Sequence, residues 1–216
     1  MDSRQQPARG AAAKRGSLSR TLIADTAIEM IEAGGIEQLT MRSLAARLDS
    51  GTMTLYTHVR NRDDLLAAVV EQLIAEMDIV GAAERKADTW QGVLVATLRE
   101  YRQIAERYPR SFELLALAPY DQLPIAPHLA AVVALVERAG LTADAARWAL
   151  STADAFATGF LVVRARTETR ASTGILASDS GGEYRGIAAL HSAEMFDLGV
   201  EAVVLGIAAK LALQGE

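Results

Sequence analysis

Two short segments of helical periodicity, separated by only three residues, are the feature that most restricts the fold of this chain. The first covers Met41–Leu48 and the second runs from Thr52 to about Val59, with Asp49-Ser50-Gly51 between them. Longer helical patterns precede and follow the pair, and Ser19 and Asn61 are the expected N-caps of those longer helices. This spacing predicts a helix-turn-helix, in which the second short helix is free to enter a groove of DNA.

The second short segment carries many polar side chains on its expected outer side. Hydroxyls, a ring nitrogen and methyl groups suit contacts with phosphates, base edges and thymine methyls. Leu55 and Val59, four residues apart, are expected to face inward and anchor the segment. Tyr56 has an alternative interpretation as a ring packed between helices, and His58 as an ordinary surface histidine. The polar candidates are Thr52, Thr54, Tyr56, Thr57 and His58.

Charge is divided unevenly along the chain. The net charge is −5, yet residues 1–62 hold nine Lys or Arg against six Asp or Glu, a net charge of +3. Residues 63–216 hold the other 13 bases against 21 acids, a net charge of −8. The first part can therefore approach a polyanion that the second would repel. Alternatively, residues 1–18, predicted to be a disordered basic arm, carry the excess charge as a solvated tail, or reach into a minor groove.

Composition narrows the class of protein. Half of the residues are apolar and 23% are charged, which excludes disorder for most of the chain. The absence of cysteine excludes disulfides, thiol catalysis and Cys-ligated metals. The longest uncharged stretch, residues 122–136, is interrupted by two prolines and is too short to span a bilayer, and the N-terminus lacks a secretory signal. We therefore expect a soluble, cytoplasmic, all-α protein without a membrane partner.

The remainder of the chain predicts a second helical unit. A long helix is expected to begin at Asn61 and continue to about Met77, and Asp88 is the expected N-cap of the next one. Residues 167–184 break the pattern with Ser, Thr, Gly and charge. The further expected helices cover 88–107, 109–118, 129–139, 142–166 and 195–213.

Residues 39–66, LTMRSLAARLDSGTMTLYTHVRNRDDLL, resemble the DNA-binding segment of TetR-family transcriptional repressors. The Thr-Leu-Tyr-X-His-Val core at 54–59, followed by Asn-Arg and Leu-Leu, is similar to the tetracycline repressor branch. The resemblance implies a three-helix DNA-binding domain at 19–60 and a larger helical ligand-binding and dimerisation domain at 61–216. The positions that it matches to DNA contacts are Arg42, Thr52, Met53, Thr54, Tyr56, Thr57, His58 and Arg62.

The turn departs from the family pattern. Where the family commonly has Gly-Val, this chain has Asp49-Ser50, which still tolerates a turn. Asp49 also brings a negative charge near the phosphates, so the operator sequence of relatives is not carried over.

The ligand half departs further. The tetracycline repressor branch holds a drug–magnesium complex through a histidine and an acidic residue, and this chain has Leu114 or Leu115 and Val163 near those places. Tetracycline, a metal and any other cofactor are therefore not predicted. His128 and His191 are isolated and lack the spacing of metal ligands.

A pocket for a small molecule is still expected between the middle helices. Thr97 and Tyr101 match an amide and an aromatic that contact the drug in relatives. Asp154 is least expected on its apolar helix and needs a partner, a dimer interface or a ligand, because an unpaired buried carboxylate is costly. For each single aromatic, the favoured alternative interpretation is plain core. The candidate ligand contacts are Thr97, Tyr101, Phe112, Trp148, Asp154, Phe156, Thr158 and Phe160.

The helices at 142–166 and 195–213 are apolar on more faces than a monomer buries, so a homodimer is expected. The resemblance implies a regulator, by family default a repressor, that binds a palindromic DNA operator and is released by a small-molecule effector. No enzyme is predicted, since no catalytic motif is found. A protein-binding helical adaptor is the alternative, but it leaves the polar Thr52–His58 surface unexplained. The small residues expected at the dimer interface are Ala149, Ala153, Ala157, Gly199, Ala202 and Gly206.

Overall fold

The structure is a computed structural model that describes residues 18–86, 88–172 and 189–213, and these residues form helices and no strand. The predicted all-α fold is confirmed. The expected basic arm lies outside the described residues except for its last residue, as does most of the segment 167–184. The elements are α1 (Arg20–Gly34), η1 (Ile36–Gln38), α2 (Met41–Arg47), α3 (Thr52–Tyr56), α4 (Arg62–Glu76), α5 (Ile79–Lys86), α6 (Trp90–Arg107), α7 (Phe112–Ala116), α8 (Ile125–Arg138), α9 (Ala143–Ser172), η3 (Ala189–His191) and α11 (Ala193–Ala212).

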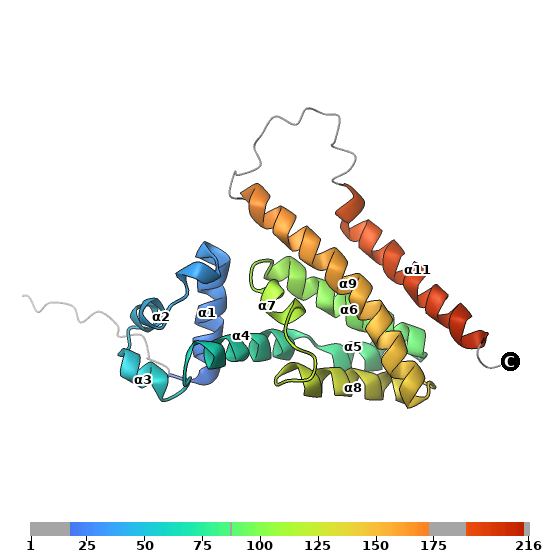
Figure 1. The fold of residues 1–216 in the computed structure, drawn as a ribbon, viewed down its shortest axis with the longest axis horizontal. Helices are drawn as coiled ribbons and strands as arrows, with labels where there is room; N and C mark the ends of the chain where they lie inside the picture. The colour runs from blue at the N-terminus through green and yellow to red at the C-terminus, as the bar shows by residue number, and fades with distance from the viewer. Residues whose placement is uncertain (1–17, 87, 173–188, 214–216) are drawn as a thin grey trace, which may run out of the picture.

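Helices α1, α2 and α3 form the expected three-helix unit at one end of the molecule (Figure 1). Local capping explains where they start. The Ser19 hydroxyl accepts from the backbone N–H of Leu22, and the Thr40 hydroxyl accepts from that of Ser43. Helix α3, the second helix of the pair, is shorter than predicted, because regular helix ends at Tyr56 and single turns continue to Val59.

Helix α4 leaves this unit and leads into the larger helical part (Figure 1). Asn61 caps it as predicted, accepting from the backbone N–H of Asp64 at 2.8 Å. Asp78 then caps α5, a helix that the sequence pattern did not indicate, by accepting from the backbone N–H of Gly81 at 3.2 Å. Thr89, one residue after the predicted Asp88, caps α6.

In the larger part, several predicted helix boundaries were wrong, and α7 covers Phe112–Ala116 rather than 109–118. Helix α8 begins at Ile125 rather than 129 and therefore contains Pro127 in its first turn. A proline is tolerated there because the backbone N–H groups of a first turn have no partner within the helix. Helix α9 continues past 166 to Ser172, with Arg164 and Glu168 paired one turn apart at 2.9 Å. Ser192 caps α11, which starts two residues before the predicted position.

One apolar core extends from α1 to α11. Leu55 and Val59 anchor α3 in it, and Phe112 and Phe196 are its largest fully buried side chains. Helices α9 and α11 lie side by side at the end of the molecule opposite α2 and α3 (Figure 1). None of the helices described here is long and apolar enough to cross a membrane.

Candidate nucleic-acid interface and ligand cavity

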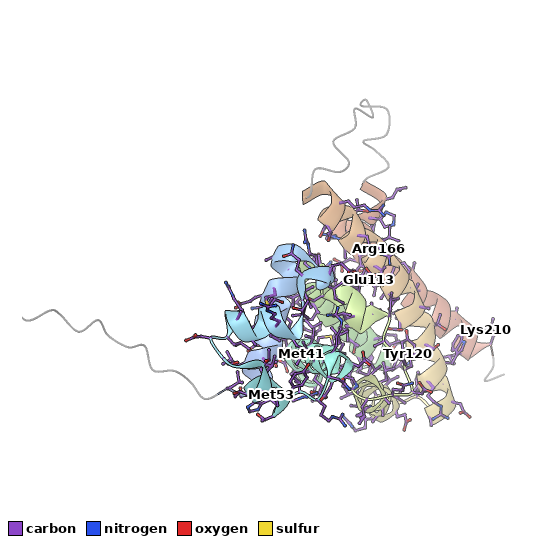
Figure 2. The ribbon with its side chains drawn as sticks, turned by 60° about the vertical axis from the view of Figure 1, so that its left-hand side comes forward. Met41, Met53, Glu113, Tyr120, Arg166 and Lys210 are labelled. Atoms are coloured by element: carbon purple, nitrogen blue, oxygen red, sulfur yellow. The ribbon has the colours of Figure 1, made fainter. Side chains whose placement is uncertain are left out.

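Helix α3 exposes its polar side chains to solvent, while two apolar side chains of this segment are buried and hold it against the core. Leu55 and Val59 have no exposed surface, whereas Met53 is 78% exposed and Tyr56 43% exposed. Met53 lies at the periphery of the molecule (Figure 2). Tyr56 therefore does not pack between helices in this structure. The other predicted contact residues of this segment, Thr52, Thr54 and Thr57, are exposed, and His58 is half-buried.

The turn that orients α3 depends on Asp49. Its φ of +49° lies in the left-handed region that glycine prefers. The next residue, Ser50, donates its backbone N–H to the carbonyl oxygen of Ala45 at 3.0 Å, so the pair closes the C-terminus of α2 as a Schellman motif does. Asp49 is exposed, so its charge stands beside the polar face of α3.

Arg62, matched above to a DNA contact, is exposed and also forms hydrogen bonds within the chain. Its guanidinium donates to the backbone carbonyl oxygens of Leu39 and, at 3.3 Å, Ile36. These carbonyls belong to the connection between α1 and α2. The Arg62 side chain therefore ties that connection to the start of α4.

Asp64, in the first turn of α4, organises two further arginines. Its carboxylate accepts from the backbone N–H of Arg60 at 2.8 Å, from the Arg60 side chain at 3.1 Å and from Arg20 at 3.0 Å. The backbone N–H of Arg60 is the main cause that lowers the pKa of Asp64 to about 2; burial opposes it, and both guanidiniums add to it. Arg42 is different, because it is exposed and no acceptor among the described residues pairs with it.

A cavity of about 40 Å³ lies between α6, α8 and α9. Three predicted ligand contacts line it: Thr97, Tyr101 and Asp154. Within the described ranges, the buried Thr97 hydroxyl has no hydrogen-bond partner. Tyr101 shares a hydrogen bond of 3.2 Å with Thr158, and burial raises its pKa above the usual range.

Two more residues of the cavity wall, Tyr120 and His128, were not among the predicted contacts. The Tyr120 hydroxyl donates to the carboxylate of Asp154, and burial, followed by this contact, raises the pKa of Tyr120 to about 12. Burial also raises the pKa of Asp154, although the Tyr120 hydrogen bond opposes this, and burial lowers the pKa of His128. Tyr120 lies in an irregular loop, where no periodicity could have indicated it.

The remaining predicted ligand contacts lie elsewhere. Phe112 packs on Tyr101, with ring centroids 4.8 Å apart, outside the cavity wall. Phe156 stacks on Phe196 of α11 at 5.9 Å, and Phe160 meets the same ring edge-on at 5.4 Å, so both belong to the packing of α9 against α11. Trp148 is 39% exposed and does not line the cavity.

The cavity touches the end of the helix that begins beside the DNA-binding unit. Met77 and Ile79, which directly follow α4, form part of its wall. Glu76, in the last turn of α4, accepts from the Tyr108 hydroxyl at 2.8 Å and pairs with Arg107 at 3.2 Å at the end of α6. Helix α4 therefore extends from Arg62 at its start to the cavity wall at its end.

Helices α9 and α11 share an exposed apolar face. Leu198, Leu205 and Val163 are 52%, 70% and 46% exposed, and a side chain added at Gly159 or Gly206 would meet nothing within 4 Å. Part of the predicted interface lies elsewhere, since Ala149, Ala153 and Ala157 are fully buried within the chain and Gly199 sits against the Phe156 ring. Ala202 and Gly206 remain on the exposed face.

In the three-helix unit, a short turn joins α2 to α3, and α3 exposes polar side chains while buried ones anchor it. This arrangement defines a helix-turn-helix DNA-binding unit. In the described ranges no three His, Asp or Glu side chains come together as metal ligands. Residues 23–69 match the sequence profile of the family described as bacterial regulatory proteins, tetR family. This stretch of the chain, which holds the helix-turn-helix, is therefore similar to the DNA-binding segment of this family.

Known relatives support the family. The chain is 27% identical over 145 residues to the HTH-type transcriptional repressor DrrR1 of Streptomyces coeruleorubidus, covering 65% of this chain and 50% of that one. It is 34% identical over 82 residues to the class A tetracycline repressor protein from transposon 1721 of Escherichia coli, covering 38% of each. These matches span half of the relatives' length or less. The relatives are named as transcriptional regulators and not as enzymes.

A solved structure shows the same fold over most of the chain. The Streptomyces coelicolor TetR family protein ActR in complex with actinorhodin aligns with a TM-score of 0.67 and 22% sequence identity, over 90% of this chain and 99% of that one. At this identity the likeness concerns the fold.

Proposed function

We propose that this chain is a transcriptional repressor that binds a palindromic DNA operator as a homodimer and leaves it when a small-molecule effector binds. The observation that carries the proposal is helix α3, whose polar side chains are exposed while Leu55 and Val59 fix it from below. The side chains proposed to contact bases are Thr52, Met53, Thr54, Tyr56, Thr57 and His58, with Arg42 on the phosphates. Such a role requires a cytoplasmic location.

The dimer of this proposal forms through the exposed face of α9 and α11. Leu198 and Leu205 lie on it beside the open positions Gly159 and Gly206, which allow close approach of two helix pairs. A twofold axis there would hold two α3 helices for successive major grooves, about 34–36 Å apart. Sedimentation is expected to give about twice the chain mass of 23.1 kDa. A Leu205→Glu variant should sediment as a monomer.

Release by an effector follows from the position of α4. A ligand that enlarges the cavity pushes on Met77 and Ile79, and α4 transmits the displacement over about 22 Å to the three-helix unit. The spacing of the two α3 helices would then no longer match the operator. ActR, which has this fold, was solved with the small molecule actinorhodin.

Selection of bound sequences from random DNA tests the proposal. Two inverted half-sites, one helical turn apart from centre to centre or a multiple of this, are expected to be enriched. Recovery of no common sequence, with binding that responds only to salt, would contradict it.

A further inference from the structure

Two hollows in the helical part share one wall. A cavity of about 40 Å³ lies on one side of this wall, and a groove of about 470 Å³ lies on the other side. Tyr120 and Asp154 line both hollows, and the hydroxyl of one donates to the carboxylate of the other. Leu129 and Leu150 also line both hollows, so the Tyr120–Asp154 pair is the polar part of the wall between them. The inner cavity alone is too small for a ligand of drug size, which typically occupies roughly 300–1,000 Å³.

Around this wall, carboxylates outnumber cationic side chains. Asp154 forms no ion pair with any residue that the structure describes. Arg147 also lines the groove, but its guanidinium pairs with Asp144, and Glu137 adds a second carboxylate. The hollows thus offer a half-buried carboxylate with a neutral phenol as its partner. Such a carboxylate is costly to bury, and a cation at hydrogen-bond distance offsets this cost.

A second feature of the inner cavity also points to a ligand. The Thr97 hydroxyl is buried in the wall, and no hydrogen bond to it occurs within the part of the chain that the structure describes. Buried polar atoms without partners are rare in folded proteins. Most of the surrounding wall is apolar, including Leu98, Leu115 and Val132. A ligand for this space needs an apolar body, a polar group for Thr97 and a group for Asp154.

We propose that the effector is an apolar molecule carrying one protonated amine, which takes the place of the Tyr120 hydroxyl on Asp154 and so joins the two hollows into one site. Tyr120 is free to move because it is 51% exposed and lies in the loop between α7 and α8, beside α9 (Figure 2). An anionic ligand would meet two carboxylates, and a neutral one could donate a hydrogen bond to Asp154 but would bring no counter-charge to it. This proposal rests on the effector-binding role proposed above and names the chemical class of the effector.

A matched set of probes tests it on the full chain without DNA. Phenylbutylamine, phenylbutanol and phenylbutyrate share one apolar body and differ in the charge of the terminal group. Calorimetric titration is expected to show binding of the amine about tenfold or more tighter than that of the alcohol, with the acid weakest, since a charged hydrogen bond is stronger than a neutral one. Equal affinities, a preference for the alcohol or acid, or no measurable binding of the amine would overturn the proposal.

Two variants test whether Asp154 causes the preference for the amine. Asp154→Asn should abolish it, while Asp63→Asn, the same change on an exposed residue of α4 that lines neither hollow, should retain it. If Asp154→Asn fails to fold, Tyr120→Phe provides the test. It removes the competing hydrogen bond and should tighten amine binding, and an unchanged or weaker affinity would contradict the proposal. Operator binding is measured separately, so failure of the repressor assignment and failure of the amine assignment are distinguishable.

Discussion

The carboxylate of Glu32, near the end of α1, accepts a hydrogen bond from the backbone N–H of Ser111 at 2.7 Å and so joins the three-helix unit to the start of α7. The backbone N–H of Arg110 approaches the same carboxylate at 3.3 Å, and α7 has no side-chain cap of its own. Glu32→Ala should lower the free energy of unfolding by about 1–2 kcal/mol, the usual effect of removing a charged cap. Urea denaturation measures it.

The matched control for this contact is Glu37→Ala, because Glu37 is exposed and no hydrogen bond or ion pair joins it to α7 among the described residues. It should change stability by less than about 0.5 kcal/mol. Equal losses in the two variants would mean that the Glu32 contact does not stabilise the protein.

The two arginines matched to DNA contacts should behave differently. Arg62→Ala removes the donor to the carbonyl oxygens of Leu39 and Ile36, so it should cost about 1–2 kcal/mol of stability. Arg42→Ala should leave stability unchanged, weaken binding to all DNA alike, and reduce the slope of log affinity against log salt by about one. Full stability of Arg62→Ala together with a reduced salt slope would instead favour a phosphate contact for Arg62.

Asp64 gives the stability of the protein a specific pH dependence. Its pKa falls from the ordinary 3.8 to about 2 on folding, so its contribution is present above pH 4 and is lost as the pH falls toward 2. Asp64→Asn should therefore be less stable than the wild type by about 1–2 kcal/mol at pH 7, after allowance for solvent screening. This difference should shrink between pH 4 and pH 3. A difference that stays constant with pH would show that Asp64 acts by packing alone.

Asp49 combines backbone strain with an unfavourable charge. Asp49→Gly should raise stability by about 0.5–1 kcal/mol, because glycine adopts a φ of +49° without a steric penalty. Asp49→Asn keeps the side-chain shape and removes only the charge. Both variants should bind DNA more tightly at low salt, and the gain should fade at high salt. Tighter binding by Asp49→Gly alone would assign the effect to the backbone.

Local chemistry made the helix starts of the DNA-binding unit predictable. Ser19 and Asn61 were identified as caps from residue type and position, since a cap bonds to a backbone N–H two or three residues away. The same local periodicity placed Leu55 and Val59 inside, whereas the exposure of Tyr56 was decided by the structure. The family resemblance added which exposed positions to associate with DNA.

Contacts between distant segments could not be predicted in the same way. Arg62 reaches carbonyls 23 and 26 residues earlier, and Tyr120 reaches Asp154 across 34 residues. The sequence identified Asp154 as needing a partner but not which one. Phe156 and Phe160 have the composition of a pocket wall, yet α11 covers them, because aromatic side chains serve the core and a cavity equally well.

The central claim is that the exposed face of α3 reads the operator. The most direct measurement is the affinity of a Tyr56→Ala, His58→Ala variant for the selected operator, compared with wild type and with Gln103→Ala, an exposed change on α6. The double variant should remain a folded helical dimer and bind about tenfold to a hundredfold more weakly, while Gln103→Ala binds like the wild type. Unchanged operator affinity of the folded double variant would contradict the claim.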